Sequence, residues 1–142
     1  MSGATEPERV YARLCRAVNA HDLDAIADCL AEDYNALDHR VLGWETMGRE
    51  AVVDVYRSWL DVVPDMEVTF EWLGGDDDHI ALRWNGQGHA AADVGGGAAE
   101  YRLILVATIR DGRIAYTERF DLDDEGAALA RLAELQSPAP DH

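Results

Sequence analysis

The sequence predicts an α+β domain in which helices come first and a curved antiparallel sheet follows. Apolar residues recur at helical spacing as far as Val63, alternate at strand spacing from Met66 to Leu122, and short turn signals separate the strand-like runs. Consecutive strands with short links predict an antiparallel meander that closes only partly over the helices and leaves a pocket between the two layers. The length of 142 residues fits one core, so we expect a single domain over residues 1–142.

Three helices are expected in the first half of the chain. Each carries an apolar face, such as Val10, Leu14 and Val18 in the first, and Asp22 can cap the second. The third ends before Pro64, because the residue that precedes a proline disfavours helix. The expected helices span 6–19, 23–33 and 49–63, and the first strand spans 34–39.

Four strands and a last helix are expected in the second half. The links between the strands are rich in Gly and Asp, as is typical of tight turns. Asp123 or Asp124 can cap the last helix. The expected strands span 66–73, 79–89, 100–109 and 113–122, the helix spans 125–135, and residues 1–5 and 137–142 are expected to be disordered.

Composition and charge exclude several functions. The net charge of −16 argues against nucleic acids and anionic membrane surfaces as partners, and no run of about 18 apolar residues could cross a membrane. No export signal is visible at the start, so we expect a cytoplasmic protein. All 12 basic residues are arginine, which excludes Schiff-base chemistry on lysine.

Nucleophiles, metals and cofactors are not indicated. The three serines occur outside any nucleophile-elbow pattern, and Cys15 and Cys29 fall on apolar helix faces as small core residues. The run from Asp76 to Asp78 lacks the spacing of a calcium loop and is interpreted as a hairpin turn. We therefore expect no metal and no cofactor.

Strand alternation predicts which residues form the inner wall of the pocket. Two carboxylates, Asp38 and Glu118, are then the only acids on a wall that is otherwise apolar and aromatic. Burial in such a wall should raise the pKa of a carboxyl group and suit it to proton transfer near neutral pH. The expected inner residues are Tyr34, Ala36, Asp38, Ile80, Leu82, Trp84, Tyr101, Leu103, Leu105, Ala107, Ile114, Tyr116, Glu118 and Phe120.

Structural explanations for the same residues stay open. Asp38 could be held by Arg40, and Glu118 could form an exposed ion pair with Arg119 or Arg83. His39 is expected on the outer face, and His89 is either a solvated loop histidine or a ligand contact. Large aromatic residues at these spacings either belong to the core or line a binding site. Both alternatives stay open for Trp44, Tyr56, Trp59 and Trp84, whereas Trp72 is expected in the core or in a dimer contact.

The chain resembles the nuclear transport factor 2-like superfamily, in its SnoaL-like, ketosteroid isomerase-like and limonene epoxide hydrolase-like branch. The resemblance is carried by "LCRAVNAHDLDAIADCLAEDYNALDH", "GREAVVDVY" and "GRIAYTERFDL". It implies a cone-shaped, cystatin-like α+β barrel on three N-terminal helices, with a deep apolar pocket. We also expect a homodimer formed through the outer face of the sheet.

The resemblance also suggests roles for single residues. Asp38 falls where ketosteroid isomerases carry the general base, but the positions of their two oxygen-holding acids match Leu14 and Leu105, which cannot donate a hydrogen bond. Glu118 aligns with a carboxylate of limonene epoxide hydrolases. Their Arg and Asp on a middle strand are replaced here by Trp84 and Gly86.

The expected function is acid/base catalysis without a cofactor on an apolar small molecule, such as ring closure, isomerisation or epoxide opening of a polyketide-like or terpenoid-like substrate. Glu118 would be the principal acid/base and Asp38 the second carboxylate, with Tyr34 and Tyr101 as hydroxyl donors. The alternative is a ligand-binding or dimerisation module without catalysis. The expected ligand-binding residues are Leu14, Trp44, Tyr56, Trp59, Trp84, His89, Leu105 and Tyr116.

Overall fold

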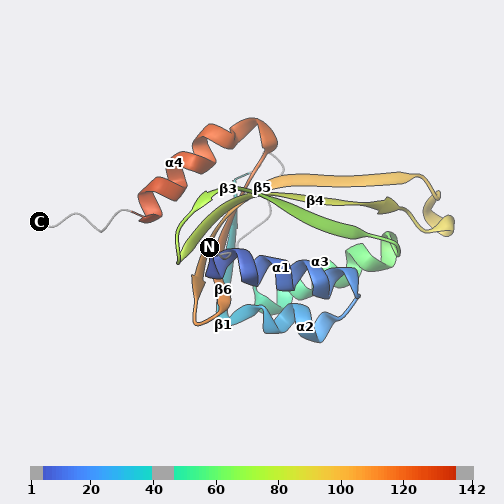
Figure 1. Ribbon diagram of the computed structural model, residues 1–142. Helices are drawn as coiled ribbons and strands as arrows, with labels where there is room; N and C mark the ends of the chain where they lie inside the picture. Colours follow the sequence, from blue (N-terminus) through green and yellow to red (C-terminus); the bar gives the residue numbers. More distant parts are fainter. Residues whose placement is uncertain (1–4, 40–46, 137–142) are drawn as a thin grey trace, which may run out of the picture.

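A curved sheet separates two layers of helices in the computed structural model, which describes residues 5–39 and 47–136. Helices α1, α2 and α3 lie against one face of the sheet and α4 lies on the other (Figure 1). The helices are α1 (Glu6–Asn19), α2 (Leu23–Asp28), α3 (Arg49–Val62) and α4 (Glu125–Gln136). The strands are β1 (Leu30–Asp38), β2 (Met47–Gly48), β3 (Glu67–Gly75), β4 (His79–His89), β5 (Ala98–Arg110) and β6 (Arg113–Phe120).

The helical hairpin forms for local reasons that the sequence makes visible. Thr5, one of the residues for which disorder was expected, caps α1 in a reciprocal capping box with Glu8. Asp22 caps α2 by accepting a hydrogen bond from the backbone of Ala25, as predicted. The prediction that α2 continues to residue 33 is wrong, because the chain enters β1 at Leu30 and pairs there with β6.

The sheet is mixed, with the strand order β2-β1-β6-β5-β4-β3. β3, β4, β5 and β6 form the predicted antiparallel meander, but β1 pairs with β6 in parallel, so the expectation of a wholly antiparallel sheet is wrong. The sheet does not close, since β2 and β3 lie at its opposite edges. The predicted α+β class with a curved sheet on three N-terminal helices is confirmed.

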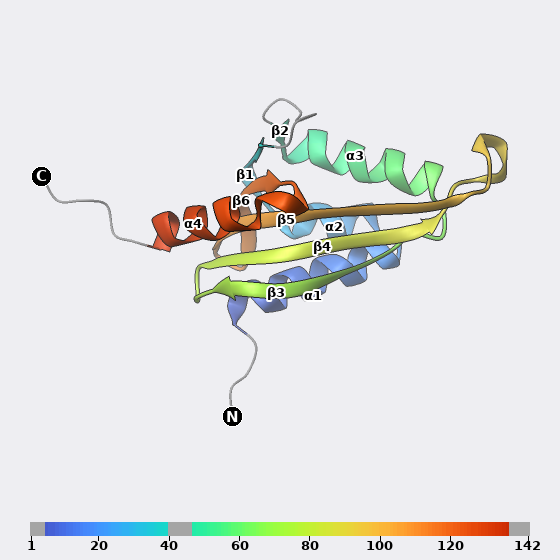
Figure 2. The same cartoon turned by 90° about the horizontal axis from the view of Figure 1, so that it is seen from above.

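Each face of the sheet has its own core. The face toward α1, α2 and α3 carries the larger one, which includes Val18, Ile26 and Leu82. On the opposite face, Ile104, Val106 and Phe120 pack against Ala128 and Leu132 of α4. Figure 2 shows α4 lying over the sheet, on the side away from the other helices.

A short turn joins the last strand to α4. A 3-10 turn, η2 (Leu122–Asp124), precedes α4 and contains both expected capping residues, Asp123 and Asp124. Residues 1–4 and 137–142, for which disorder was expected, lie outside the described residues. None of the described helices is both long and apolar enough to cross a membrane.

Candidate active site

One row of side chains across the inner face of the sheet combines apolar residues with an arginine and an aspartate. Leu82 on β4 is paired with Leu105 on β5, and Leu105 with Arg119 on β6. On the other side of Arg119, the parallel register places Asp38 of β1. Paired residues on adjacent strands project from the same face. Arg119 is 7% exposed and Asp38 is half-buried, so a cation and a carboxylate lie side by side in an apolar interior.

Tyr34 holds Arg119 in this interior. Its hydroxyl lies 2.6 Å from Oγ1 of Thr117 and also forms a side-chain hydrogen bond with Arg119. Burial raises the pKa of Tyr34, although the charge of Arg119 and these hydrogen bonds oppose the rise, so the phenol stays neutral. With both partners in place, Tyr34 orients the guanidinium group instead of presenting its own proton to a ligand.

Two buried donors have no hydrogen-bond partner among the described residues, Oη of Tyr11 and Nη1 of Arg119. Tyr11 comes from α1 and is 1% exposed. Burial raises the pKa of Tyr11 well above its ordinary value, Tyr34 and Tyr56 raise it further, and the charge of Arg119 lowers it, so these four groups lie within electrostatic range. Buried polar atoms are almost always paired, and an unpaired one calls for an explanation, of which a catalytic or binding role is one.

Aromatic rings surround these donors. Tyr11 packs edge-on against Trp84, with ring centroids 6.1 Å apart, and Trp59 packs against Tyr101 at 5.2 Å. A gap adjoins this interior at the end of α3, with Trp59, Met66, Gly86 and Tyr101 among its lining residues, and it is too narrow to hold a water molecule. The interior therefore offers aromatic surface beside two donors, and a ligand must move these side chains apart to enter it.

Several of the expected site residues meet in this interior and others do not. Leu14, Tyr34, Trp84 and Leu105 belong to the inner core, and Tyr56, Trp59 and Tyr101 pack against it. His89 lies at the end of β4, where its Nδ1 is 2.9 Å from Oδ2 of Asp65 and its side chain is two-thirds exposed. Trp44 and Arg40 lie outside the described residues.

Glu118 faces away from this interior, so its expected place on the inner wall is wrong. Its Oε2 accepts a hydrogen bond from Nε of Arg131 on α4 at 2.6 Å, and its Oε1 lies 2.6 Å from Nε2 of His39. Burial would raise the pKa of Glu118, but the hydrogen bonds from Arg131 and His39 hold it below its ordinary value. Glu118 is therefore an ionised carboxylate that ties α4 to the sheet.

A bulge in β6 explains the error. Thr108 pairs with Tyr116 but Ile109 pairs with Ile114, which leaves Ala115 as one extra residue on β6. Ile114 faces the inner core as predicted, but one extra residue turns every later side chain to the opposite face. Tyr116, Glu118 and Phe120 consequently lie on the outer face, and Thr117 and Arg119 take the inner positions.

Sequence reasoning therefore missed Tyr11, Thr117 and Arg119. Tyr11 could have been found, because it lies three residues before Leu14 on the apolar face of α1. Thr117 and Arg119 could not, since nothing in "RIAYTERF" marks Ala115 as a bulge.

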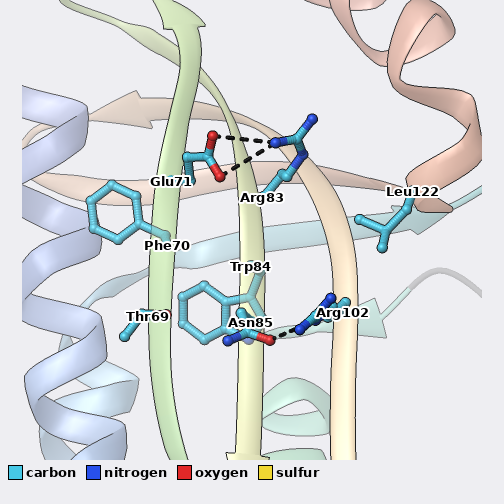
Figure 3. Close-up of a pocket in the computed structure, with 8 residues that line it drawn as sticks. All are labelled: Thr69, Phe70, Glu71, Arg83, Trp84, Asn85, Arg102 and Leu122. Atoms are coloured by element: carbon cyan, nitrogen blue, oxygen red, sulfur yellow. Dashed lines mark hydrogen bonds and ion pairs between the residues drawn. The ribbon is translucent and has the colours of Figure 1, made fainter.

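A second hollow, on the outer face of the sheet, has a volume of about 550 Å³ and is drawn in Figure 3. Its charged side chains already have partners, since Arg83 pairs with Glu71 and Glu125, and Arg102 donates to Asn85 at 3.1 Å. Phe70 points away from it toward α1 in Figure 3. The interior is the better candidate because its buried donors lack partners.

Metal ligands do not gather at either place. In the described ranges, no group of three or more His, Cys, Asp or Glu side chains could hold a metal ion. Cys15 and Cys29 are free and buried, and burial raises the pKa of Cys15 to about 12, so this thiol stays protonated.

Solved structures with the same architecture support a common fold. IdmH of Streptomyces antibioticus, proposed to be a polyketide cyclase, is 23% identical and has a TM-score of 0.65, with 89% of this chain and 98% of that chain covered. An epoxide hydrolase of M. tuberculosis, similar to limonene epoxide hydrolase, is 20% identical with a TM-score of 0.63, covering 91% and 92%. A ketosteroid isomerase-like protein of Catenulispora acidiphila, solved with trimethylamine, is 19% identical with a TM-score of 0.65, covering 95% and 100%.

The family comparison agrees with these structures. A search of curated proteins found no match. The model of the SnoaL-like domain, however, matches residues 11–117, which run from the buried Tyr11 of α1 to Thr117 of β6. The resemblance inferred from the sequence is thus confirmed, and the chain belongs to the SnoaL-like domain family.

Proposed function

We propose that this protein catalyses proton transfer on an apolar small molecule, without a cofactor, in the interior between α1, α3 and the sheet. Asp38 is the base, and Nη1 of Arg119 and Oη of Tyr11 hold the oxygen on which negative charge develops. The observation that carries the proposal is a pair of buried donors that have no partner among the described residues and share an apolar interior with Asp38. Glu118, bound to Arg131 on the outer face, has no part in it.

The proposed chemistry uses each group once. Asp38 accepts a proton from a carbon next to a carbonyl group, and the electron pair moves onto the carbonyl oxygen. Arg119 and Tyr11 donate hydrogen bonds to that oxyanion, an interaction that strengthens as the charge develops. Return of the proton to another carbon gives isomerisation, and attack of the enolate carbon on a second carbonyl gives ring closure.

Opening of an epoxide would use the same groups. Asp38 would accept a proton from water as the water oxygen attacks an epoxide carbon and the bond from that carbon to the epoxide oxygen breaks. The leaving oxygen, held by Arg119 and Tyr11, would take a proton from solvent, and Asp38 would return its proton to solvent. Structural relatives include an epoxide hydrolase and SalBIII, an epoxide hydrolase/cyclase-like enzyme of pyran ring formation in salinomycin (19% identical, TM-score 0.65, 80% of this chain and 88% of that chain covered). These likenesses support the fold and a choice of test substrates.

A ligand-binding module without catalysis is the second candidate. Asp38 and Arg119 are neighbours in the register of β1 and β6. A carboxylate beside a cation has a lowered affinity for protons and is a weaker base, which would make the site a static binder of polar groups.

The test is exchange of the acidic protons of β-tetralone, an apolar ketone, for deuterium in heavy water, followed by NMR. The wild-type protein should accelerate the exchange, and Asp38→Asn should slow it by about 10²- to 10⁴-fold, because the amide cannot accept the proton. Asp33→Asn is the matched control, since Asp33 lies on the same strand but is exposed and paired with Arg110. If Asp38→Asn exchanges β-tetralone as fast as the wild type, the protein is not an acid/base catalyst that uses Asp38.

A further inference from the structure

The buried guanidinium group of Arg119 forms a hydrogen bond with Tyr34, but its hydrogen-bonding capacity is only partly used by the described residues. Tyr34 provides an acceptor, but Nη1 has no partner among the described residues. Leu105, paired with Arg119 on β5, cannot provide one. An arginine stays charged in any protein environment, so this side chain cannot escape the cost of its burial by losing a proton.

The tyrosines around Arg119 cannot neutralise it, so Asp38, its neighbour in the register of β1 and β6, is the acid that lies beside it. Burial raises the pKa of Tyr11, of Tyr34 and of Tyr56, so all three are neutral phenols at physiological pH. Tyr11 adds a second unpaired donor from a different element, α1. Two donors in the same interior, one of them on a permanent cation, therefore have no hydrogen-bond acceptor in the part of the chain that the structure describes.

We propose that the interior selects ligands in which an anionic oxygen group, above all a carboxylate, is attached to a flat apolar body. The anionic oxygens would accept from Nη1 of Arg119 and Oη of Tyr11, and the apolar body would pack among Trp84, Trp59 and Tyr101. A guanidinium fork matches the two oxygens of a carboxylate, and charge-assisted hydrogen bonds of this kind are about twice as strong as neutral ones. This inference rests on the proposed function for the location of the bound ligand, but it does not require that the protein catalyses a reaction.

The net charge of the protein makes such a preference diagnostic. The chain carries a net charge of −16, which repels anions from its surface as a whole. Affinity for an anion must then come from a local site. Salt screens contacts between exposed charges and has little effect on buried ones, so binding in the interior should persist at high salt.

The test compares β-naphthoate with β-naphthamide, an uncharged molecule of nearly the same shape, by isothermal titration calorimetry on the whole protein. The wild type should bind β-naphthoate about tenfold more tightly or better, at low and at high salt. Arg119→Met should abolish the difference, and Tyr11→Phe should weaken β-naphthoate several-fold. Arg102→Met is the matched control, because Arg102 is an exposed arginine on the outer face and should leave both affinities unchanged.

Each other outcome overturns the inference. Equal affinities in the wild type, no binding of either compound, or a preference that survives in Arg119→Met would each do so. The wild-type comparison decides even where a variant does not fold. Binding of β-naphthoate without exchange of β-tetralone refutes the proposed catalysis alone, and exchange without a preference for the anion refutes this inference alone.

Discussion

At the scale of single residues, Tyr11 and Tyr34 differ in whether their buried hydroxyl groups form hydrogen bonds. Tyr11 and Tyr34 are both almost fully buried, but within residues 5–39 and 47–136 only the hydroxyl of Tyr34 has a partner. A buried donor without an acceptor loses its hydration and gains nothing in return. Tyr11 therefore lowers the stability of the ligand-free protein, as is common for groups that serve binding.

Tyr11→Phe is expected to raise the free energy of unfolding by about 1 kcal/mol, because it removes the unpaired hydroxyl and keeps the ring contacts with Trp84 and Phe70. Tyr34→Phe, the matched control, should lower it by about 1 kcal/mol, since Thr117 and Arg119 lose their partner. Urea unfolding of the three proteins measures both changes. A loss of stability in Tyr11→Phe would show that its hydroxyl is satisfied.

The bulge at Ala115 is the feature that matters most at the scale of elements. It exchanges the two faces of β6, so that Arg119 enters the interior and Glu118 meets α4. The side chain of Glu118 is 2% exposed, and its contacts with Arg131 and His39 offset the cost of burying the carboxylate. A buried carboxylate that loses a cationic partner is strongly destabilising.

Arg131→Met is expected to lower the free energy of unfolding by about 2 kcal/mol and to loosen α4 first. Hydrogen exchange followed by mass spectrometry should show that the variant exchanges faster than the wild type, with a larger increase in residues 125–136 than in β4 and β5. Glu134→Gln removes only the exposed ion pair of Arg131 with Glu134 at 3.9 Å, so it is the control and should change neither. Uniform loss of protection over the whole chain would argue that Glu118 stabilises the sheet and not the docking of α4.

The pKa of Glu118 determines how the stability of the whole molecule should change in acid. The pKa of Glu118 is lower in the folded protein than the value of about 4.3 expected for an unfolded chain. Its contribution to stability is therefore complete above that unfolded value and is lost as the pH falls through the folded pKa. Urea unfolding between neutral and acidic pH should show a smaller loss of stability in Glu118→Gln than in the wild type, and parallel curves would contradict this assignment.

Assembly is the second property of the whole molecule that can be tested. The expected homodimer would use the outer face of the sheet, but α4 covers part of that face and leaves open the part around Arg83 and Arg102 (Figure 3). Leu122 is 40% exposed and lines the hollow there, which suits a contact, whereas Trp72 is paired with Leu82 and projects from the inner face. Light scattering should give twice the chain mass of 15.7 kDa, and Leu122→Ser should shift it toward one chain mass. A wild-type protein of 15.7 kDa would exclude the dimer.

The sequence by itself determined the class of the fold, the order of the elements and the apolar lining of the interior, because hydrophobic periodicity and turn residues are local signals. It also indicated that Asp38 shares a face with Tyr34 and Ala36. Tertiary structure alone decided that β1 runs parallel to β6 and that Ala115 forms a bulge. Pairing and register depend on packing between strands that are distant in the chain, and one extra residue was enough to place Arg119, and not Glu118, at the centre of the site.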